Sequence, residues 1–119
     1  MNKTRDSRAT VLVIEDIGWI RAGMKSSLKF YGHLVLEAAD DEEAIEIGSR
    51  IHLDLILTEE ELPTFDALRK RLREHPTLRH VPVVIVNPDA KDGTRYGEVK
   101  VIPGYNRIGS LLATQRSWP

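Results

Sequence analysis

The sequence predicts a doubly wound α/β domain with a five-stranded parallel sheet. Apolar runs typical of strands buried on both faces alternate with stretches of helical apolar spacing, which is the pattern of βαβ units. The clearest of these runs covers residues 53–57 and leads soon into three consecutive glutamates. The 119 residues are enough for one core. We therefore expect a single domain over residues 1–119, with a polar lead at 1–9 and a frayed tail at 116–119.

Each strand and each helix follows from a local signal. Apolar runs predict five strands, at residues 11–14, 34–38, 53–58, 81–86 and 99–102. Recurring apolar side chains predict four helices, at about residues 18–31, 40–48, 64–75 and 106–115. Gly32 is expected just past the first helix in a left-handed conformation. Asp40 and Glu43 have the spacing of a capping box, and Thr64 is the expected N-cap of the third helix.

The alternation of strands and helices stops after the fourth predicted strand. Residues 87–98 contain Pro88, an Asp92-Gly93 pair and Gly97, and they have no apolar periodicity. Glycine and proline at such a density favour turns over helix. We therefore expect a loop where the pattern requires a fourth helix, which is missing or replaced.

Composition excludes several classes of protein. A net charge of −1 gives no general reason to expect a nucleic acid as partner. The absence of cysteine excludes disulfides and thiolate chemistry, and no catalytic triad or phosphate-binding loop is present, so we do not expect an enzyme. No apolar run is long enough for a membrane span or a signal peptide, so a cytoplasmic protein is expected. The basic stretch at residues 69–80 is interpreted as a solvated helix face, paired in part with acids at 40–46.

Acidic residues follow two of the predicted strands. Glu15 and Asp16 come directly after the first strand, and Glu59 comes at the end of the third. The carboxyl ends of parallel strands meet at one edge of a sheet, where ligands of open α/β sheets bind. The sequence therefore predicts one acidic pocket built from these three residues.

In order and spacing, these features resemble the receiver domain of two-component response regulators. The resemblance runs from about residue 11 to residue 112 and includes the acidic pair, Arg21, the Leu62-Pro63 pair and Asp66. It implies a flavodoxin-like fold with the strand order 2-1-3-4-5. It also implies a role in signal transduction through contacts with other proteins.

Three positions depart from the pattern of that family. Glu59 stands where the resemblance implies a phosphate-accepting Asp, Asn87 where it implies Ser or Thr, and Ile102 where it implies Lys. Glu is longer than Asp by roughly 1.5 Å, which moves the carboxylate off the in-line path. Ile102 offers no charge to balance a phosphoryl group. We therefore interpret the chain as an atypical receiver, or pseudo-receiver, that acts without phosphorylation.

Several alternatives stay open at this point. Glu15, Asp16 and Glu59 either bind Mg²⁺ weakly or form an inherited acidic cluster that shares a proton, and no other cofactor is expected. A phosphotransfer-competent receiver and a small-ligand-binding flavodoxin-like module are the alternative functions. The expected partner is a protein or a second copy, bound through the remodelled face at residues 87–112. The residues of that face are Tyr96, Val99, Tyr105, Ile108 and Leu112.

Overall fold

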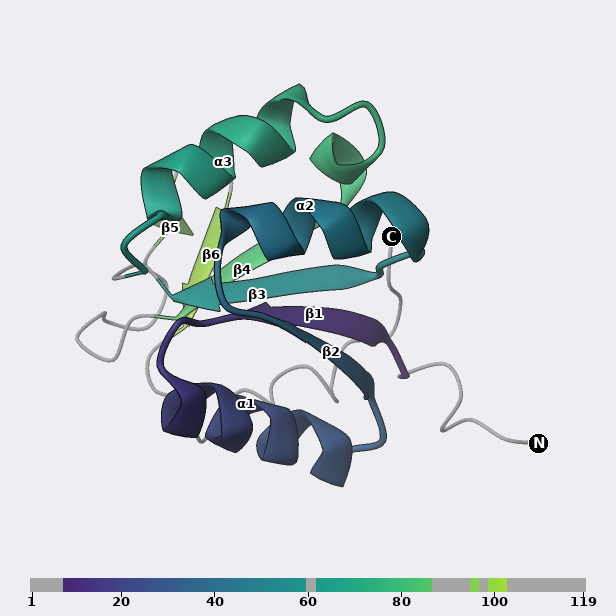
Figure 1. Cartoon of the computed structure of the whole chain (residues 1–119). Helices are drawn as coiled ribbons and strands as arrows, with labels where there is room; N and C mark the ends of the chain where they lie inside the picture. The colour runs from purple at the N-terminus through teal and green to yellow at the C-terminus, as the bar shows by residue number, and fades with distance from the viewer. Residues whose placement is uncertain (1–7, 60–61, 87–94, 97–98, 103–119) are drawn as a thin grey trace.

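The protein is a three-layer α/β domain (Figure 1). The computed structural model describes residues 8–59, 62–86, 95–96 and 99–102, and of the last two stretches only the backbone. The strands are β1 (Thr10–Ile14), β2 (Leu34–Ala38), β3 (Leu55–Glu59), β4 (Val83–Val86), β5 (Arg95–Tyr96) and β6 (Val99–Ile102). The helices are α1 (Gly18–Phe30), α2 (Asp41–Arg50), α3 (Phe65–Glu74) and the short 3₁₀ helix η2 (Leu78–His80). None of the described helices is both long and apolar enough to cross a membrane.

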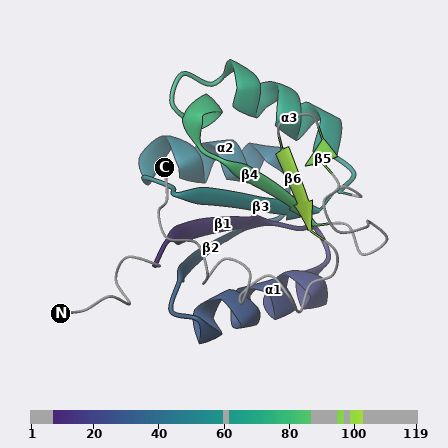
Figure 2. The same ribbon diagram turned by 180° about the vertical axis from the view of Figure 1, so that it is seen from behind.

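The sheet has the order β2-β1-β3-β4-β6-β5. The first five of these strands are parallel and β5 is antiparallel, so the predicted order 2-1-3-4-5 is confirmed with β6 as the fifth parallel strand. Helix α1 covers one face of the sheet, whereas α2 and α3 lie side by side on the other (Figures 1 and 2). A parallel sheet requires this cover because its strands are apolar on both faces.

The core consists of two clusters, one on each face of the sheet. Successive residues of β1 point to opposite faces, so Leu12 and Ile14 join the α2–α3 side, while Val11 and Val13 join the α1 side. All five residues of β3 are buried, as the continuous apolar run predicts. Burial on both faces places β3 at the centre of the sheet, and its C-terminal residue Glu59 is carried inward with it.

The predicted helix ends are mostly confirmed. Gly32 has a φ of 91°, the left-handed conformation expected after α1. The Oδ1 atom of Asp40 accepts a hydrogen bond from the Glu43 backbone N–H at 2.9 Å. The Glu43 side chain accepts in return from the backbone N–H of Ala39 at 2.7 Å, one residue earlier than in a standard capping box. Thr64 is the N-cap of α3, but its hydroxyl makes no capping bond.

The sequence-based assignment was wrong at β5. Residues 87–98 were expected to form a loop, yet Arg95 and Tyr96 pair with Lys100 and Val99 as an antiparallel strand. Two residues give no periodic signal, so only the pairing reveals this strand. The 3₁₀ helix η2 was missed for the same reason. Two further predictions lie outside the described residues. They are the missing fourth helix, expected within residues 87–94, and the last helix, expected at 106–115.

Candidate acidic site

Two glutamates meet at the C-terminal edge of the sheet. Strands β1 and β3 pair in parallel, with Ile14 opposite Thr58. The residues that follow these two along the chain, Glu15 and Glu59, are therefore neighbours. Both are deeply buried, with 1% and 6% of their surface exposed. Buried carboxyls are rare unless they are paired or neutral. The structure therefore brings Glu15 and Glu59 together, and the Asp16 side chain also bonds to Glu15.

The surroundings of Glu15 favour the protonated form of its carboxyl. Burial, followed by a hydrogen bond with Glu59, raises the pKa of the Glu15 carboxyl from 4.5 to about 8, and Asp16 acts in the same direction. The Ile17 backbone N–H opposes this shift by donating to Glu15 Oε2 at 2.9 Å. The other oxygen, Oε1, is buried and receives no hydrogen bond from a described N–H or hydroxyl. A proton on Glu15 shared with Glu59 accounts for this arrangement.

Asp16, the third predicted ligand, lies differently from the two glutamates. It follows Glu15 directly but its side chain is exposed at the rim of the site. Among the residues that the structure describes, no three His, Asp or Glu side chains are placed to hold one metal ion together. The donors are oxygens of the kind that Mg²⁺ prefers, but in this arrangement they do not form a ready-made site for it.

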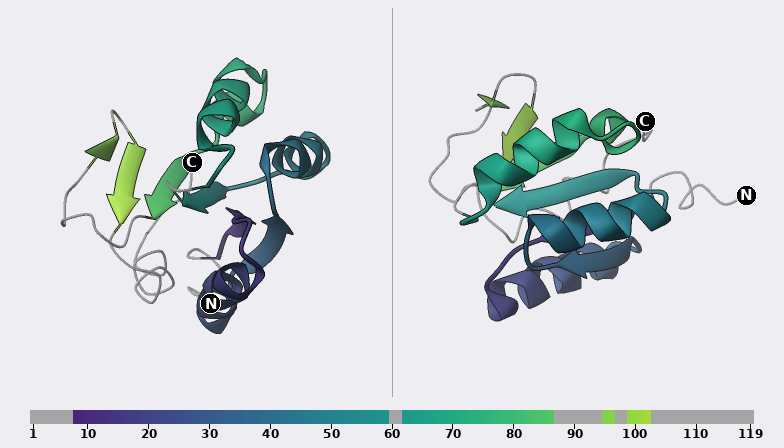
Figure 3. Two further views of the ribbon diagram at one scale, coloured as in Figure 1. Left: turned by 60° about the vertical axis from the view of Figure 1, so that its left-hand side comes forward. Right: turned by 45° about the horizontal axis from the view of Figure 1, so that its top comes forward.

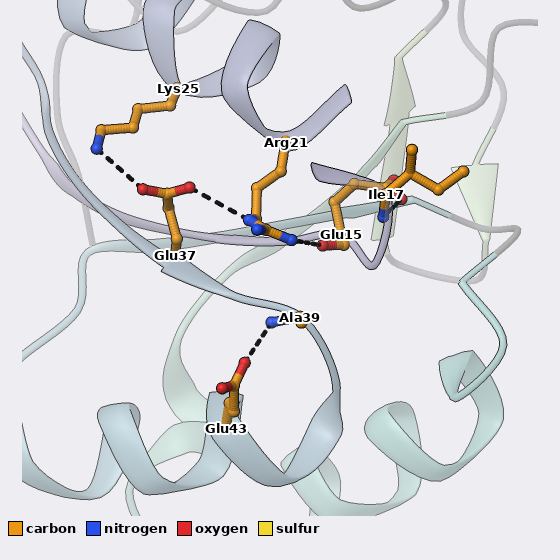
Figure 4. Close-up of polar contacts among 7 residues, drawn as sticks. All are labelled: Glu15, Ile17, Arg21, Lys25, Glu37, Ala39 and Glu43. Atoms are coloured by element: carbon orange, nitrogen blue, oxygen red, sulfur yellow. Dashed lines mark hydrogen bonds and ion pairs between the residues drawn. The ribbon is translucent and has the colours of Figure 1, made fainter. Parts of the chain in front are cut away.

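Arg21 ties helix α1 to the acidic edge (Figure 4). Its Nη1 donates to the backbone oxygen of Glu15 at 2.7 Å, and its Nε pairs with Glu37 of β2 at 3.2 Å. Lys25, one turn further along α1, pairs with the other oxygen of Glu37 at 2.9 Å. The hydrogen bond from Lys25, and then that from Arg21, lowers the pKa of Glu37. The guanidinium of Arg21 is thus committed to two partners rather than directed at the two buried carboxyls.

The sequence indicated Arg21 but not its partners Glu37 and Lys25. The i, i+4 spacing of Arg21 and Lys25 places both on one face of α1. That signal was available in the sequence. The acid they share could be identified only from the position of β2 beside β1.

The predicted phosphorylation-site positions are only partly described. Across the sheet, Glu59 lies opposite Val86, and Val86 lies opposite Ile102, the last residue of β6. Ile102 is therefore two strands, or about 10 Å, from Glu59 along the backbone row. Asn87 lies outside the described residues.

The predicted interaction face is described only at β5 and β6. Tyr96 and Val99 pair in register between the two strands. Tyr105, Ile108 and Leu112 lie outside the described residues. The basic stretch at residues 69–80 is paired in part, as predicted, since Arg71 contacts Asp41 of α2 at 3.1 Å.

Solved structures with the same architecture include receiver domains and response regulators. The receiver domain of a Pseudomonas aeruginosa sensor histidine kinase, with magnesium in its active-site cleft, has a TM-score of 0.70 at 20% identity, over 87% of this chain and 93% of that one. The Mn²⁺-bound response regulator Rcp1 has a TM-score of 0.71 at 17% identity, over 93% and 99%. The chain has the fold of a response-regulator receiver domain. This confirms the flavodoxin-like receiver fold expected from the sequence.

Curated relatives of this receiver-fold chain include a motility regulatory protein and a protein-modifying enzyme. A gliding motility regulatory protein of Myxococcus xanthus is 37% identical over 82 residues, which is 67% of this chain and 11% of the relative. A protein-glutamate methylesterase/protein-glutamine glutaminase of Alkalilimnicola ehrlichii is 31% identical over 93 residues, 74% of this chain and 23% of the relative. The chain thus spans less than a quarter of the length of either relative. No family model matches the chain.

Proposed function

We propose that this receiver-fold domain works in two-component signal transduction as a pseudo-receiver, by protein–protein contact and without phosphorylation. One observation supports this above the others. Glu59, at the position where the resemblance implies a phosphate-accepting Asp, is buried and bonded to a protonated Glu15. A carboxyl in that state is neither exposed to a phosphodonor nor free to act as a nucleophile.

The charges around Glu59 also argue against its phosphorylation. A phosphoryl group adds a charge of about −1.5 to −2, and it needs cations or oriented N–H groups to stabilise it. At this edge Arg21 is already bonded to Glu37 and to the Glu15 backbone. Position 102 is Ile, so it cannot supply a counter-charge. Both the acceptor and its electrostatic support are therefore unsuited to phosphoryl transfer, and we propose that the domain has no catalytic activity.

A resident Mg²⁺ is not part of this proposal. The magnesium of the Pseudomonas aeruginosa receiver belongs to that protein. In this chain a divalent cation must displace the proton that Glu15 shares with Glu59, because the two carboxyls are already bonded to each other. Mg²⁺ therefore binds weakly here, and more tightly as pH rises toward the pKa of Glu15.

The proposed partner is a protein or a second copy of the chain, bound at the 87–112 face. Support comes from β5 and β6, whose pairing of Tyr96 with Val99 ends the sheet at this side. Aromatic residues are favoured anchors of protein interfaces. The small-ligand alternative is less well supported. An anionic cofactor would meet Glu15 and Asp16 at the first strand–helix junction in place of a phosphate-binding loop.

An amide NMR titration tests the proposal. Mg²⁺ is added first, then beryllofluoride, which mimics a phosphoryl group, and acetyl phosphate labelling is measured in parallel. We expect Mg²⁺ to shift only amides near Glu15 and Glu59, and the mimic to add nothing. The double variant Glu59→Asp/Ile102→Lys, which restores the family's acceptor and cation, is the matched positive control. Labelling of the unaltered chain, or mimic-induced shifts at residues 99–102, would contradict the proposal.

A further inference from the structure

Strand β2 lies at one end of the sheet, with β1 on its inner side (Figures 1 and 3). We call its outer side the β2 edge. Leu34, the first residue of β2, is 60% exposed, and Glu37 is exposed as well. In β3, by contrast, all five residues are buried. The β2 edge is therefore open to solvent at its own side chains.

The backbone of β2 presents two residues to this edge. The Leu34 N–H donates to a backbone oxygen on the β1 side, and the Ala38 oxygen accepts from an N–H on the same side, both at 3.0 Å. Backbone groups alternate between the two sides of a strand, so those of Val35 and Glu37 point away from β1. Among the described residues, β2 pairs with β1 alone. One N–H and one C=O on each of these two residues are therefore directed outward.

The β2 edge lacks the features that normally protect an edge strand against pairing. Proline, lysine, a bulge or a free charge usually serves this purpose. The strand reads Leu-Val-Leu-Glu-Ala and pairs in step with β1 over all five residues. Its one charged side chain, Glu37, bonds to α1 instead, through Arg21 at 3.2 Å and Lys25 at 2.9 Å (Figure 4). The carboxylate is neutralised there, so it does not repel an added strand.

The two faces beside the edge differ in chemistry. On the α2 face, Leu36 packs against the core, and Leu34 shares that face because side chains alternate along a strand. On the α1 face, Arg21 and Lys25 share the single carboxylate of Glu37, which leaves a surplus of one positive charge. The Lys25 side chain is 37% exposed, and its ammonium group has three donors. A complementary strand is therefore apolar on one face and acidic on the other.

An exposed aromatic pair adjoins the start of this edge. Helix α1 ends at Phe30 and β2 begins at Leu34, so only a short connection separates the pair from the strand. The Phe30 and Tyr31 rings meet edge to face with centroids 5.1 Å apart, and Phe30 is 81% exposed. Exposed aromatic side chains are favoured anchors for a protein partner.

We propose that the β2 edge binds an extended, acidic segment of another protein as an additional antiparallel strand. The outward backbone groups of Val35 and Glu37 form the main-chain hydrogen bonds of this strand addition. Apolar side chains of the segment pack beside Leu34 on the α2 face, and a carboxylate on the other face pairs with Lys25. This inference is independent of the Glu15–Glu59 site and of the 87–112 face.

Segments of the chain itself match the edge less well. Residues 103–119 contain no Asp or Glu to meet the surplus positive charge. Residues 1–7 and 87–94 contain acids, but neither segment has a Leu, Ile, Val or aromatic side chain. A second copy that pairs through its own β2 would bring together two edges with the same surplus of positive charge. A partner segment that alternates apolar and acidic residues is complementary where these are not.

The test uses the full chain and a designed, fluorescein-labelled peptide of about eight residues, with Val and Glu at alternate positions. One control peptide has Lys in place of Glu. A second control keeps Glu but has Pro at two Val positions, which prevents pairing as a strand. Binding is measured by fluorescence anisotropy. We expect saturable binding of the Val–Glu peptide only, with slower hydrogen exchange at the amides of Val35 and Glu37.

Two variants of the edge should weaken binding of the Val–Glu peptide. Lys25→Gln removes the surplus charge and should cost about fivefold in affinity, and Leu34→Ser removes the exposed apolar side chain and should cost about tenfold. Lys70→Gln is the matched control, because it removes the same charge at an exposed position on α3, and we expect less than about a twofold effect.

Five outcomes would overturn the proposal. Three concern the peptides: no binding, equal binding of the Lys peptide, or equal binding of the Pro peptide. The fourth is an equal loss of affinity in Lys70→Gln, or exchange protection confined to residues outside β2. The fifth is sedimentation that shows the chain pairing with a second copy through this edge, since the occupant is then the chain itself.

Discussion

Replacing Glu15 with Gln should stabilise the protein most strongly at neutral and mildly alkaline pH. In the folded state the pKa of Glu15 is raised from 4.5 to about 8, so the folded protein keeps a proton that the unfolded chain releases. Between these two values, stability falls by about 1.4 kcal/mol for each pH unit. Glu15→Gln removes this titration while keeping the size of the side chain.

The direction of the effect follows from the raised pKa. The contribution of the Glu15 proton to stability is complete below pH 4.5, is lost as pH rises through the window to about 8, and changes no further above it. The advantage of Glu15→Gln should therefore be less than about 1 kcal/mol at pH 5 and grow to about 3 kcal/mol at pH 7. The Gln amide can also donate to Glu59, so the pair remains bonded in the variant.

Urea denaturation of both proteins at whole pH units from 5 to 9 gives the required free energies of unfolding. The remaining titrating groups are the same in both proteins, so the difference reports the titration of the Glu15–Glu59 pair. Glu74→Gln, at an exposed acid near the end of α3, is the control for the removal of one carboxylate. A difference between the unaltered chain and Glu15→Gln that is flat with pH would refute the shared-proton argument.

Other predictions concern packing, capping and an unpartnered hydroxyl, each measured as the free energy of unfolding in urea. A Cβ at Gly48 would lie 2.7 Å from both terminal carbons of buried Leu78, so Gly48→Ala should destabilise by about 1 kcal/mol despite the better helix propensity of Ala. Gly23→Ala in α1, where nothing lies within 4 Å, should stabilise by about 1 kcal/mol. Thr58→Val should stabilise by about 1 kcal/mol, and a loss would mean that the hydroxyl has a partner. Asp40→Ala should destabilise by about 1 kcal/mol by removing the N-cap of α2.

The sequence predicted most of the fold because its strands are long, continuous and apolar. The run before Glu59 is an example, since a parallel sheet buries both faces of such a strand and the acid that follows it must lie at the sheet edge. The strand at Arg95 and Tyr96 could not be predicted, because a two-residue strand is specified by its partner and not by its own pattern.

The sequence predicted which acidic residues form the candidate site, but it did not predict their protonation state. Strand order alone placed Glu15 beside Glu59, and the sequence left cation binding and proton sharing as alternatives. The choice depends on how far the carboxyls are buried and which groups donate to them, and those quantities exist only in three dimensions.

The two edges of the sheet differ in how easily a strand of another molecule could pair with them. At one edge, β5 offers only two residues of backbone, which is too short a template for another strand. At the other edge, β2 is five residues long and begins at Leu34, which is 60% exposed. Misassembly by strand addition should therefore start at β2, and a Lys at position 34 would protect this edge of the sheet against aggregation.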